Sequence, residues 1–547
     1  MSSSKPAKKT YVPEEPPKVP IFPSQPPPST FSEKFAQFTI ENRWILVLFA
    51  VLPLSFIFDR YWVVRDFFVR TIGSHFRKHD ETVRFIQAQI EHWRKSGSKN
   101  LLCTARPSWM QVTAKDNGPQ YKKKDNAILM PLYDILEIDT KRRVVRVEPG
   151  VNIGQLTQFL IPRGWTLPIV PELDDLTCGG MLLGYGIEGS GHKYGLWNDI
   201  IVSADIIVGD GSLVHCSATE NSDLFRALPW SYGGVGFCVA MEIQIIPCKK
   251  YCRLIYEPTA SIDQMVDRFT EIASAENPHE FLEGLMYDYN NGILTYGDFA
   301  DEIGSDGYYN PIGHYYKPWF HRHAETIMKK GKTVVEYIPI RHYYHRHTRS
   351  LYWEHEIMFP MGNHPIFRYF LGWLMPPKVN FLKYTQTEAM RAHSLEVHVA
   401  QDFLLPIECM KEGLKLCHET YEIYPLWLCP HAVFKTEPQG AIRAPTNGQD
   451  IEQYVDIGVW GIPGPVTRGQ RYDVHWGNQT YEKWLRENRG YQAMYAVSEQ
   501  TRDEFNEMFD QELYDQVRNK YKCKGVFMDA YDKIFAKVYR KETKKQV

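Results

Sequence analysis

The segment between residues 171 and 195, PELDDLTCGGMLLGYGIEGSGHKYG, has the residue types of a ligand cradle. Seven of its residues are glycines: Gly179, Gly180, Gly184, Gly186, Gly189, Gly191 and Gly195. Glycine has no Cβ and tolerates positive φ, so backbone N–H groups can approach a ligand closely. Asp174 or Asp175 can cap a short helix that begins near Thr177, and the free N–H groups of that helix would face an anion. We predict that this segment cradles a pyrophosphate; the alternative is a set of tight turns between strands.

A nicotinamide-type Rossmann site does not fit this segment. Gly184, Gly186 and Gly189 spell G-x-G-x-x-G, and Asp205 lies about where a ribose-binding acid would be. That motif requires a strand before the glycines and a helix after them. The residues that follow have no apolar helical face, and the next strand begins near Ile200, which leaves no room for a crossover helix. We therefore exclude this interpretation.

The densest set of possible proton donors is RHYYHRHT, residues 341 to 348. In a strand, Arg341, Tyr343, His345 and His347 would share one face. Perturbed acids gather in active sites, so Tyr343 and His345 are our candidate catalytic residues. The alternative is a structural strand whose aromatic rings pack and whose cations stay in water. Lys317 is a weaker candidate, because its neighbours look like core aromatics.

The N-terminus divides into a tail and an apolar segment. Residues 1 to 30 are proline-rich and nearly free of apolar residues, which predicts disorder. Residues 31 to 68 contain WILVLFAVLPLSFIF, and we expect residues 44 to 64 to be embedded in a lipid bilayer. A buried core helix and an in-plane anchor are the alternatives. Five cations follow the segment closely against two before it, which favours a single-pass orientation with the large domain in the cytosol.

The globular part should contain interleaved strands and helices. VVRVEPGV (144 to 151), ADIIVGDGSLVHCS (204 to 217) and GFCVAMEIQIIP (236 to 247) have strand patterns, and Asn152 should cap a helix that Gly164 ends. The net charge of −2 and the lack of a basic stripe exclude a nucleic-acid partner. The ten cysteines include no CxxC pair, so we expect reduced thiols and no metal site.

Several motifs in order resemble a known flavoprotein domain. They are T-C-G-G-x-x-x-G-x-G, HKYG, IIVGDGS and NSDLFRALPWSYGGVGFCVAMEIQIIP, and together they resemble the FAD-binding domain of the vanillyl-alcohol oxidase (PCMH-type) superfamily. PELDDLTCGG, YYKPWF, EYIPIRHYYHRHTRS, NHPIFRYFLGW and YPLWLCP look like the Delta(24)-sterol reductases of the Diminuto type. The resemblance implies an α+β fold with a PCMH-type domain over residues 69 to 248, an α+β substrate domain over 249 to 547, and an N-terminal membrane helix.

The resemblance also implies the cofactor contacts. The FAD-contacting residues would be Thr177, Cys178, Gly179, Gly180, Met181, Leu182, Leu183, Gly184, Tyr185, Gly186, Ile187, Glu188 and Gly189. We give Cys178 no chemical role. The loop from Cys103 to Trp109 takes the place where related proteins often carry a flavin-linked histidine. It has none, which implies non-covalent FAD. Arg106 in that loop would contact a phosphate or a flavin carbonyl; the alternative is a surface arginine.

The activity that the resemblance implies is NADPH-dependent reduction of the Δ24 double bond of a sterol side chain by an FAD enzyme. The flavin would supply hydride, and the protein would position the alkene and supply a proton. The expected site is the endoplasmic reticulum membrane or the Golgi membrane. Two other classes stay open: a flavin oxidase or dehydrogenase of the same fold that acts on an alcohol or lactone, and a membrane-tethered interaction protein without turnover. The sequence does not indicate an oligomeric state.

Overall fold

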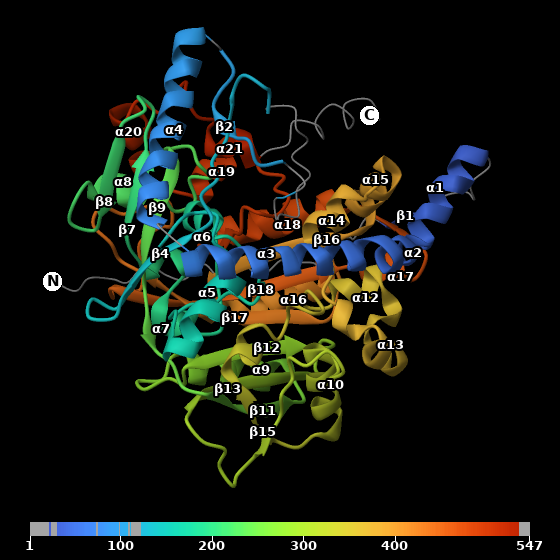
Figure 1. Ribbon diagram of the computed structural model, residues 1–547. Helices are drawn as coiled ribbons and strands as arrows, with labels where there is room; N and C mark the ends of the chain where they lie inside the picture. Colours follow the sequence, from blue (N-terminus) through green and yellow to red (C-terminus); the bar gives the residue numbers. More distant parts are fainter. Residues whose placement is uncertain are drawn as a thin grey trace, which may run out of the picture.

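In a computed structural model, two sheets of mainly antiparallel strands form the body of the protein (Figure 1). The structure describes residues 21–22, 30–72, 75–97, 99–107, 110 and 122–534. Most of the proline-rich tail therefore lies outside the described residues. Ile21–Phe22 (β1) pairs with Arg471–Tyr472 (β19), so the prediction of disorder throughout residues 1 to 30 is wrong at these two positions. The α+β fold class is confirmed.

The first domain is built on a five-stranded sheet with strand order β4-β5-β9-β7-β8. Its strands are Ile135–Asp139 (β4), Val144–Val147 (β5), Ile201–Ile207 (β7), Leu213–Ser217 (β8) and Phe237–Gln244 (β9). All neighbouring pairs are antiparallel, and β9 lies between β5 and β7 with Val145 opposite Ile243. Apolar residues of β5, β7 and β9 are buried on both faces, which explains their nearly continuous apolar runs. The three predicted strand regions are confirmed.

The helix after β5 begins where the sequence indicates. Helix α5 (Ile153–Leu160) has Asn152 as its N-cap, and the Asn152 and Gln155 side chains form a reciprocal capping box. A 3₁₀ turn over Ile161–Arg163 follows, and Gly164 ends it with φ +79°. Glycine is favoured there because a side chain would be strained in the left-handed region.

The second domain is built on a nine-stranded sheet with order β14-β15-β11-β13-β12-β17-β18-β16-β20. Its strands are Tyr308–Tyr309 (β14), Val334–Pro339 (β15), Tyr251–Thr259 (β11), Gly292–Ala300 (β13), Phe281–Met286 (β12), Leu426–Phe434 (β17), Ile451–Gly461 (β18), Val399–Pro406 (β16) and Tyr491–Gln492 (β20). Helices Ile262–Ala273 (α9), Phe320–Lys330 (α10), Met410–Thr420 (α16) and Val474–Glu487 (α18) pack on this sheet.

The end of the chain returns to the first domain. Helices Arg502–Met508 (α19), Glu512–Lys520 (α20) and Ala530–Ile534 (α21) carry it back, and Leu102 forms an isolated bridge with Phe527. Lys520 and Lys522 pair with Asp223 and Asp210 of the first domain. The division expected at residue 248 therefore does not separate two independent bodies.

The apolar N-terminal segment is helical and lies lengthwise against the body (Figure 1). It comprises Phe31–Glu41 (α1), Arg43–Leu46 (α2), a π-helical turn Val47–Val51 and Leu52–Ile72 (α3). By length and composition, Arg43–Val69 could cross a membrane, and 22% of its most apolar window is buried in the protein. Val47, Val51 and Leu52 form a small core with Phe359, Phe367 and Leu382.

Polar contacts hold α3 to both domains. Asp59 pairs with Lys378 at 2.8 Å, and Arg65 pairs with Asp134 at 2.8 Å. The Gln155 side chain of α5 donates a hydrogen bond to Asp66. The sequence leaves open a helix that crosses the membrane and an anchor in its plane. In either arrangement, one side of this helix is already bound to the rest of the protein.

Candidate functional site

The glycine-rich segment forms a short helix at the boundary between the two domains. Helix α6 (Cys178–Leu183) begins after Thr177, and Gly179 packs so closely on the turn after β5 that an added Cβ would lie 2.5 Å from Pro149 Cβ. Gly180 is different: it is exposed, and a Cβ there would meet among the described residues only Thr177 Oγ1, at 3.0 Å. Gly180 thus presents backbone to open space beside the start of α6.

The expected aspartate cap of this helix is wrong. Thr177 occupies the N-cap position, and its side chain makes no capping hydrogen bond. Asp174 pairs with His345, and Asp175 pairs with Lys378 at 2.6 Å. Both carboxylates are thus engaged by side chains of the second domain.

Arg106 lies at the same end of α6. Its guanidinium contacts the Thr177 hydroxyl at 3.5 Å and donates a hydrogen bond to the Met110 carbonyl at 2.8 Å. Burial lowers the pKa of Arg106. Both of these hydrogen bonds go to neutral oxygens, and the Asp175 carboxylate acts on the guanidinium through its charge. Ser108 and Trp109 of the predicted loop lie outside the described residues.

A cavity of about 750 Å³ runs from the glycine segment to the N-terminal helices. Its volume falls in the range of ~300–1,000 Å³ usual for small-molecule sites. Tyr185, Gly186 and Ile187 line one part, and Ile40 and Trp44 line another. The remaining walls come from Glu354–Met358 (α12), Val379–Tyr384 (α14), Glu388–Val397 (α15), β16 and α18. The cavity therefore connects the predicted cofactor cradle with the apolar segment.

Other residues of the predicted FAD stretch are structural. Cys178, Met181 and Leu182 belong to the buried core, and burial raises the pKa of the Cys178 thiol, which agrees with its having no chemical role. Gly189 packs against the backbone of Leu282, where an added Cβ would lie 2.6 Å from the Leu282 carbonyl oxygen. Gly184 is similarly confined by the Gly180 carbonyl, and Leu183 is half-buried. Of the other members, Gly180 is exposed, and Tyr185, Gly186 and Ile187 line the cavity.

Glu188 of this stretch belongs to a buried ionic cluster that joins the domains. Arg346 Nη2 lies 2.9 Å from Glu188 and 2.8 Å from Glu283 of β12, and its side chain is fully buried. Glu172 is 3.8 Å from the same nitrogen. Burial lowers the pKa of Arg346, but the negative charges of Glu188 and Glu283 outweigh this effect and hold the pKa above its usual value.

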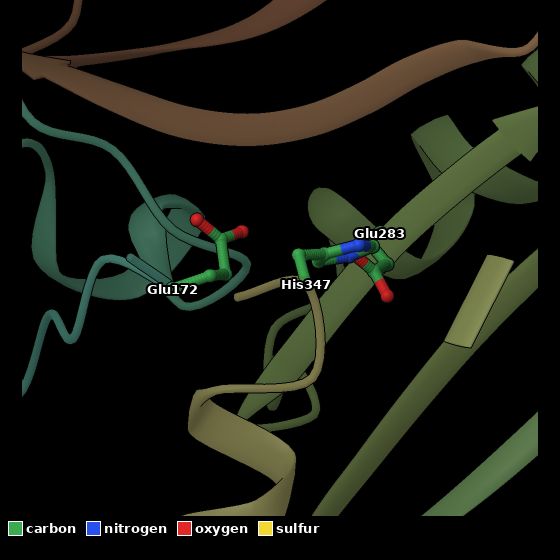
Figure 2. A group of neighbouring side chains, drawn as sticks. All are labelled: Glu172, Glu283 and His347. Carbon is green, nitrogen blue, oxygen red and sulfur yellow. The ribbon is translucent and has the colours of Figure 1, made fainter. Parts of the chain in front are cut away.

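Figure 2 shows Glu172, Glu283 and His347 of this cluster converging from three separate segments. One potential ligand atom from each lies within 4.8 Å of the others, a spacing that a metal ion could use. Arg346 already supplies a cation to Glu283, and burial together with the Glu188 charge raises the pKa of Glu172, which favours its neutral form. The geometry thus points to a charge-balanced structural cluster.

The predicted catalytic strand is wrong. Strand β15 ends at Pro339, and residues Ile340–Tyr344 form helix α11, followed by turns. Tyr343 is fully buried against Phe281 and Arg346, and its hydroxyl has no hydrogen-bond partner in the described chain. His345 bonds Asp174 and the Thr157 hydroxyl. Neither Tyr343 nor His345 lines the cavity, because the helical turn directs them into the domain interface. Lys317 also lies away from it.

Sequence reasoning missed two buried aspartates beside the cavity. Asp402 of β16 and Asp456 of β18 are 4% and 0% exposed. Each aspartate interrupts an apolar run, VAQDFLLP for Asp402 and YVDIGVWG for Asp456. A single carboxylate within an apolar strand is the sequence feature that could have identified them as candidate functional residues.

The start of α6 fits the anionic part of FAD. The exposed backbone at Gly180 and the guanidinium of Arg106 beside the Thr177 hydroxyl suit a pyrophosphate. Bound there, FAD would supply hydride transfer, while Arg106 and Thr177 would hold its anionic part.

Comparison with known proteins agrees with this site. A family described as FAD binding domain matches residues 86–217. Delta(24)-sterol reductase of Homo sapiens is 44% identical over 495 residues, which cover 90% of this chain and 94% of that protein. Delta(24)-sterol reductase of Pisum sativum is 40% identical over 525 residues, covering 91% and 92%. L-gulonolactone oxidase of Bos taurus is 27% identical over 113 residues, or 21% of this chain.

The two reductases match 90% and 91% of this chain, whereas the oxidase matches about a fifth of it. The chain is an FAD-dependent oxidoreductase and belongs to the Delta(24)-sterol reductase family.

Proposed function

We propose that this protein reduces the Δ24 double bond of a sterol side chain with non-covalently bound FAD and with NADPH as electron donor. The observation that carries the proposal is the cavity between the glycine segment and the N-terminal apolar helices. A sterol is confined to the bilayer, so its enzyme needs a path from an apolar surface to the cofactor. Leu176, Ile187, Leu382, Val399 and Trp427 give this path apolar walls for a rigid ring system.

The surface at the cavity mouth supports a membrane location. Phe49, Ile57 and Phe67 project outward from the N-terminal helices, and Phe370 (74% exposed) and Trp373 project from the segment after α12. The two groups adjoin, because the Phe56 and Trp373 rings are 5.1 Å apart. Exposed apolar patches of this kind mark membrane or protein contacts.

We assign this patch to a lipid bilayer, because its largest part is a helix long and apolar enough to enter one. Since α3 is bound along one side to both domains, the helix lies in the membrane surface with its outer face in lipid. The large domain would face the cytosol at the endoplasmic reticulum or Golgi membrane.

Changing Phe370 and Trp373 together to glutamate should weaken membrane binding by about tenfold or more. Each aromatic buried in lipid contributes about 1.5–3 kcal/mol, and both lie outside the N-terminal helix. Flotation of the full chain with phosphatidylcholine vesicles measures the effect. Leu213→Glu on the far strand β8, where Leu213 is 47% exposed, is the control and should bind normally. Unchanged binding of the double variant would mean that the helix alone holds the membrane.

The half-reactions test the proposed function directly. Under anaerobic conditions NADPH should bleach the flavin absorption, and a sterol with a side-chain Δ24 double bond should restore it. The saturated sterol is the control and should leave the flavin reduced. Stopped-flow absorbance follows both steps, and denaturation should release the flavin intact. Flavin reduction by an alcohol or lactone, with indifference to the sterol, would assign the protein to the oxidase or dehydrogenase class.

A further inference from the structure

Two carboxyl groups lie on one face of the nine-stranded sheet where it closes the cavity. Asp402 pairs with Gly458 across β16 and β18, and Asp456 stands two residues before Gly458. Side chains at this diagonal spacing share a face and are close enough to interact. Asp402 lines the cavity together with Tyr185 of the glycine segment and Tyr495 after β20. The pair therefore stands between the predicted cofactor cradle and the apolar part of the cavity.

Tyrosine hydroxyls hold these carboxyl groups. Tyr185 donates a hydrogen bond of 2.6 Å to Asp456, and Tyr495 hydrogen-bonds Asp402. Trp460 Nε1 in turn donates a 3.0 Å hydrogen bond to the Tyr495 hydroxyl, which fixes its position. One oxygen of each carboxyl, Oδ1, is buried and has no partner among the described residues. Asp402 thus lines the cavity and keeps one buried carboxyl oxygen without a partner in the described chain.

The surroundings of the pair favour the protonated acid. The titratable groups that interact with it are tyrosines and one cysteine, and none of them is a cation: Tyr185, Tyr481, Tyr491, Tyr495 and Cys429 of β17. Burial raises the pKa of Asp402 to about 7, and burial together with the Asp402 charge raises the pKa of Asp456 well above its usual value. A carboxylic acid kept protonated near neutral pH is suited to general-acid chemistry.

We infer that Asp402 is the proton donor of the reduction, with Tyr495 and Asp456 as positioning residues. The inference rests on the proposed function and identifies the residue that supplies its proton. The π bond of the alkene breaks, one carbon takes hydride from the reduced flavin, and the other takes the proton of the Asp402 carboxyl. Two C–H bonds form, the flavin is oxidised and the alkene is reduced. The Asp402 carboxylate regains a proton from solvent as the product leaves.

Asp402→Asn tests the assignment, because the amide keeps the shape and loses the acidic proton. Sterol-dependent reoxidation of the flavin should slow by roughly 10²–10⁴-fold, the usual contribution of a general acid. Tyr495→Phe should slow it less, since the hydroxyl only positions the acid. Glu482→Gln is the matched control: Glu482 of α18 is 1% exposed and burial raises its pKa to about 8, but it lies away from the cavity. This control should react at the wild-type rate.

The pH profile separates a proton donor from a structural residue. The wild-type reoxidation rate should be high below pH 7 and fall above it, as Asp402 loses its proton; the Asp402→Asn rate should be flat there. Infrared difference spectra with ¹³C-labelled aspartate give a readout independent of turnover. A protonated carboxyl band should titrate near pH 7 in the wild type and be absent from Asp402→Asn.

The outcomes distinguish the two proposals. Wild-type flavin that the Δ24 sterol does not reoxidise would overturn the proposed function. Wild-type turnover with an Asp402→Asn rate within about threefold of it would overturn the assignment of Asp402 alone. If the Asp402→Asn protein is unfolded or lacks flavin, the reoxidation rate of Tyr495→Phe and the infrared titration of the wild type test the assignment instead. An aspartate band that titrates near pH 4 would then overturn the assignment.

Discussion

Replacing Arg346 by methionine should lower the free energy of unfolding by about 3–5 kcal/mol. The guanidinium is fully buried and lies 2.9 Å from Glu188 and 2.8 Å from Glu283. Methionine fills a similar volume but leaves both carboxylates without a cation in a site that water does not reach. Their protonation would relieve part of this cost, at the expense of their remaining hydrogen bonds. Chemical denaturation at neutral pH measures the loss.

The same substitution at Arg322 is the matched control. Arg322 of α10 pairs with Glu356 at 2.7 Å and with Glu325 at 2.6 Å, but 42% of its side chain is exposed. Arg322→Met should therefore cost about 1 kcal/mol or less, because solvent screens exposed pairs. Equal losses for the two variants would show that Arg346 does not join the domains through its buried charge. Glu188 belongs to the first domain and Glu283 to the second, so the Arg346 variant should also reduce flavin retention.

Local patterns predicted the first domain well. The turn between β7 and β8 and the Asn152 cap of α5 depend on neighbouring residues, so a short window of sequence identifies them. The glycine segment was also recognisable, because its density of glycines has few other uses. These features needed no knowledge of the distant partner strands.

Features that depend on distant contacts were missed. RHYYHRHT alternates polar and aromatic residues as a strand would, yet it folds as α11 and turns because Arg346 and His347 must reach Glu283 in the interior. Asp402 and Asp456 are 54 positions apart and meet only through the pairing of β16 with β18. The contact between Asp59 and Lys378 could not be read from the sequence either, because nothing near residue 59 indicates its partner.

Gly180→Val should reduce FAD affinity by roughly 100-fold, about 2.7 kcal/mol, and leave the fold intact. A side chain at Gly180 projects into open space beside Thr177 and Arg106, where we place the pyrophosphate. The β-branched group would keep the anion from the backbone at Gly180 and from Arg106, and among the described residues its Cβ meets only the Thr177 hydroxyl oxygen. Flavin fluorescence titration of the apoprotein, with the melting temperature measured in parallel, gives both quantities.

Gly184→Val is the informative contrast, because both glycines belong to the same segment. A Cβ on Gly184 would lie 2.7 Å from the Gly180 carbonyl oxygen, so that variant must distort the segment and should lose stability as well as flavin. Gly180→Val should lose flavin with a melting temperature close to that of the wild-type apoprotein. Wild-type FAD affinity in Gly180→Val would mean that the pyrophosphate binds elsewhere, and that Gly180 is exposed for a reason unrelated to the cofactor. Loss of stability in both variants would mean that the open side of α6 is covered in the folded protein. Only selective loss of flavin at Gly180 places the pyrophosphate beside Thr177 and Arg106, in the segment that continues to Tyr185 and the acid pair.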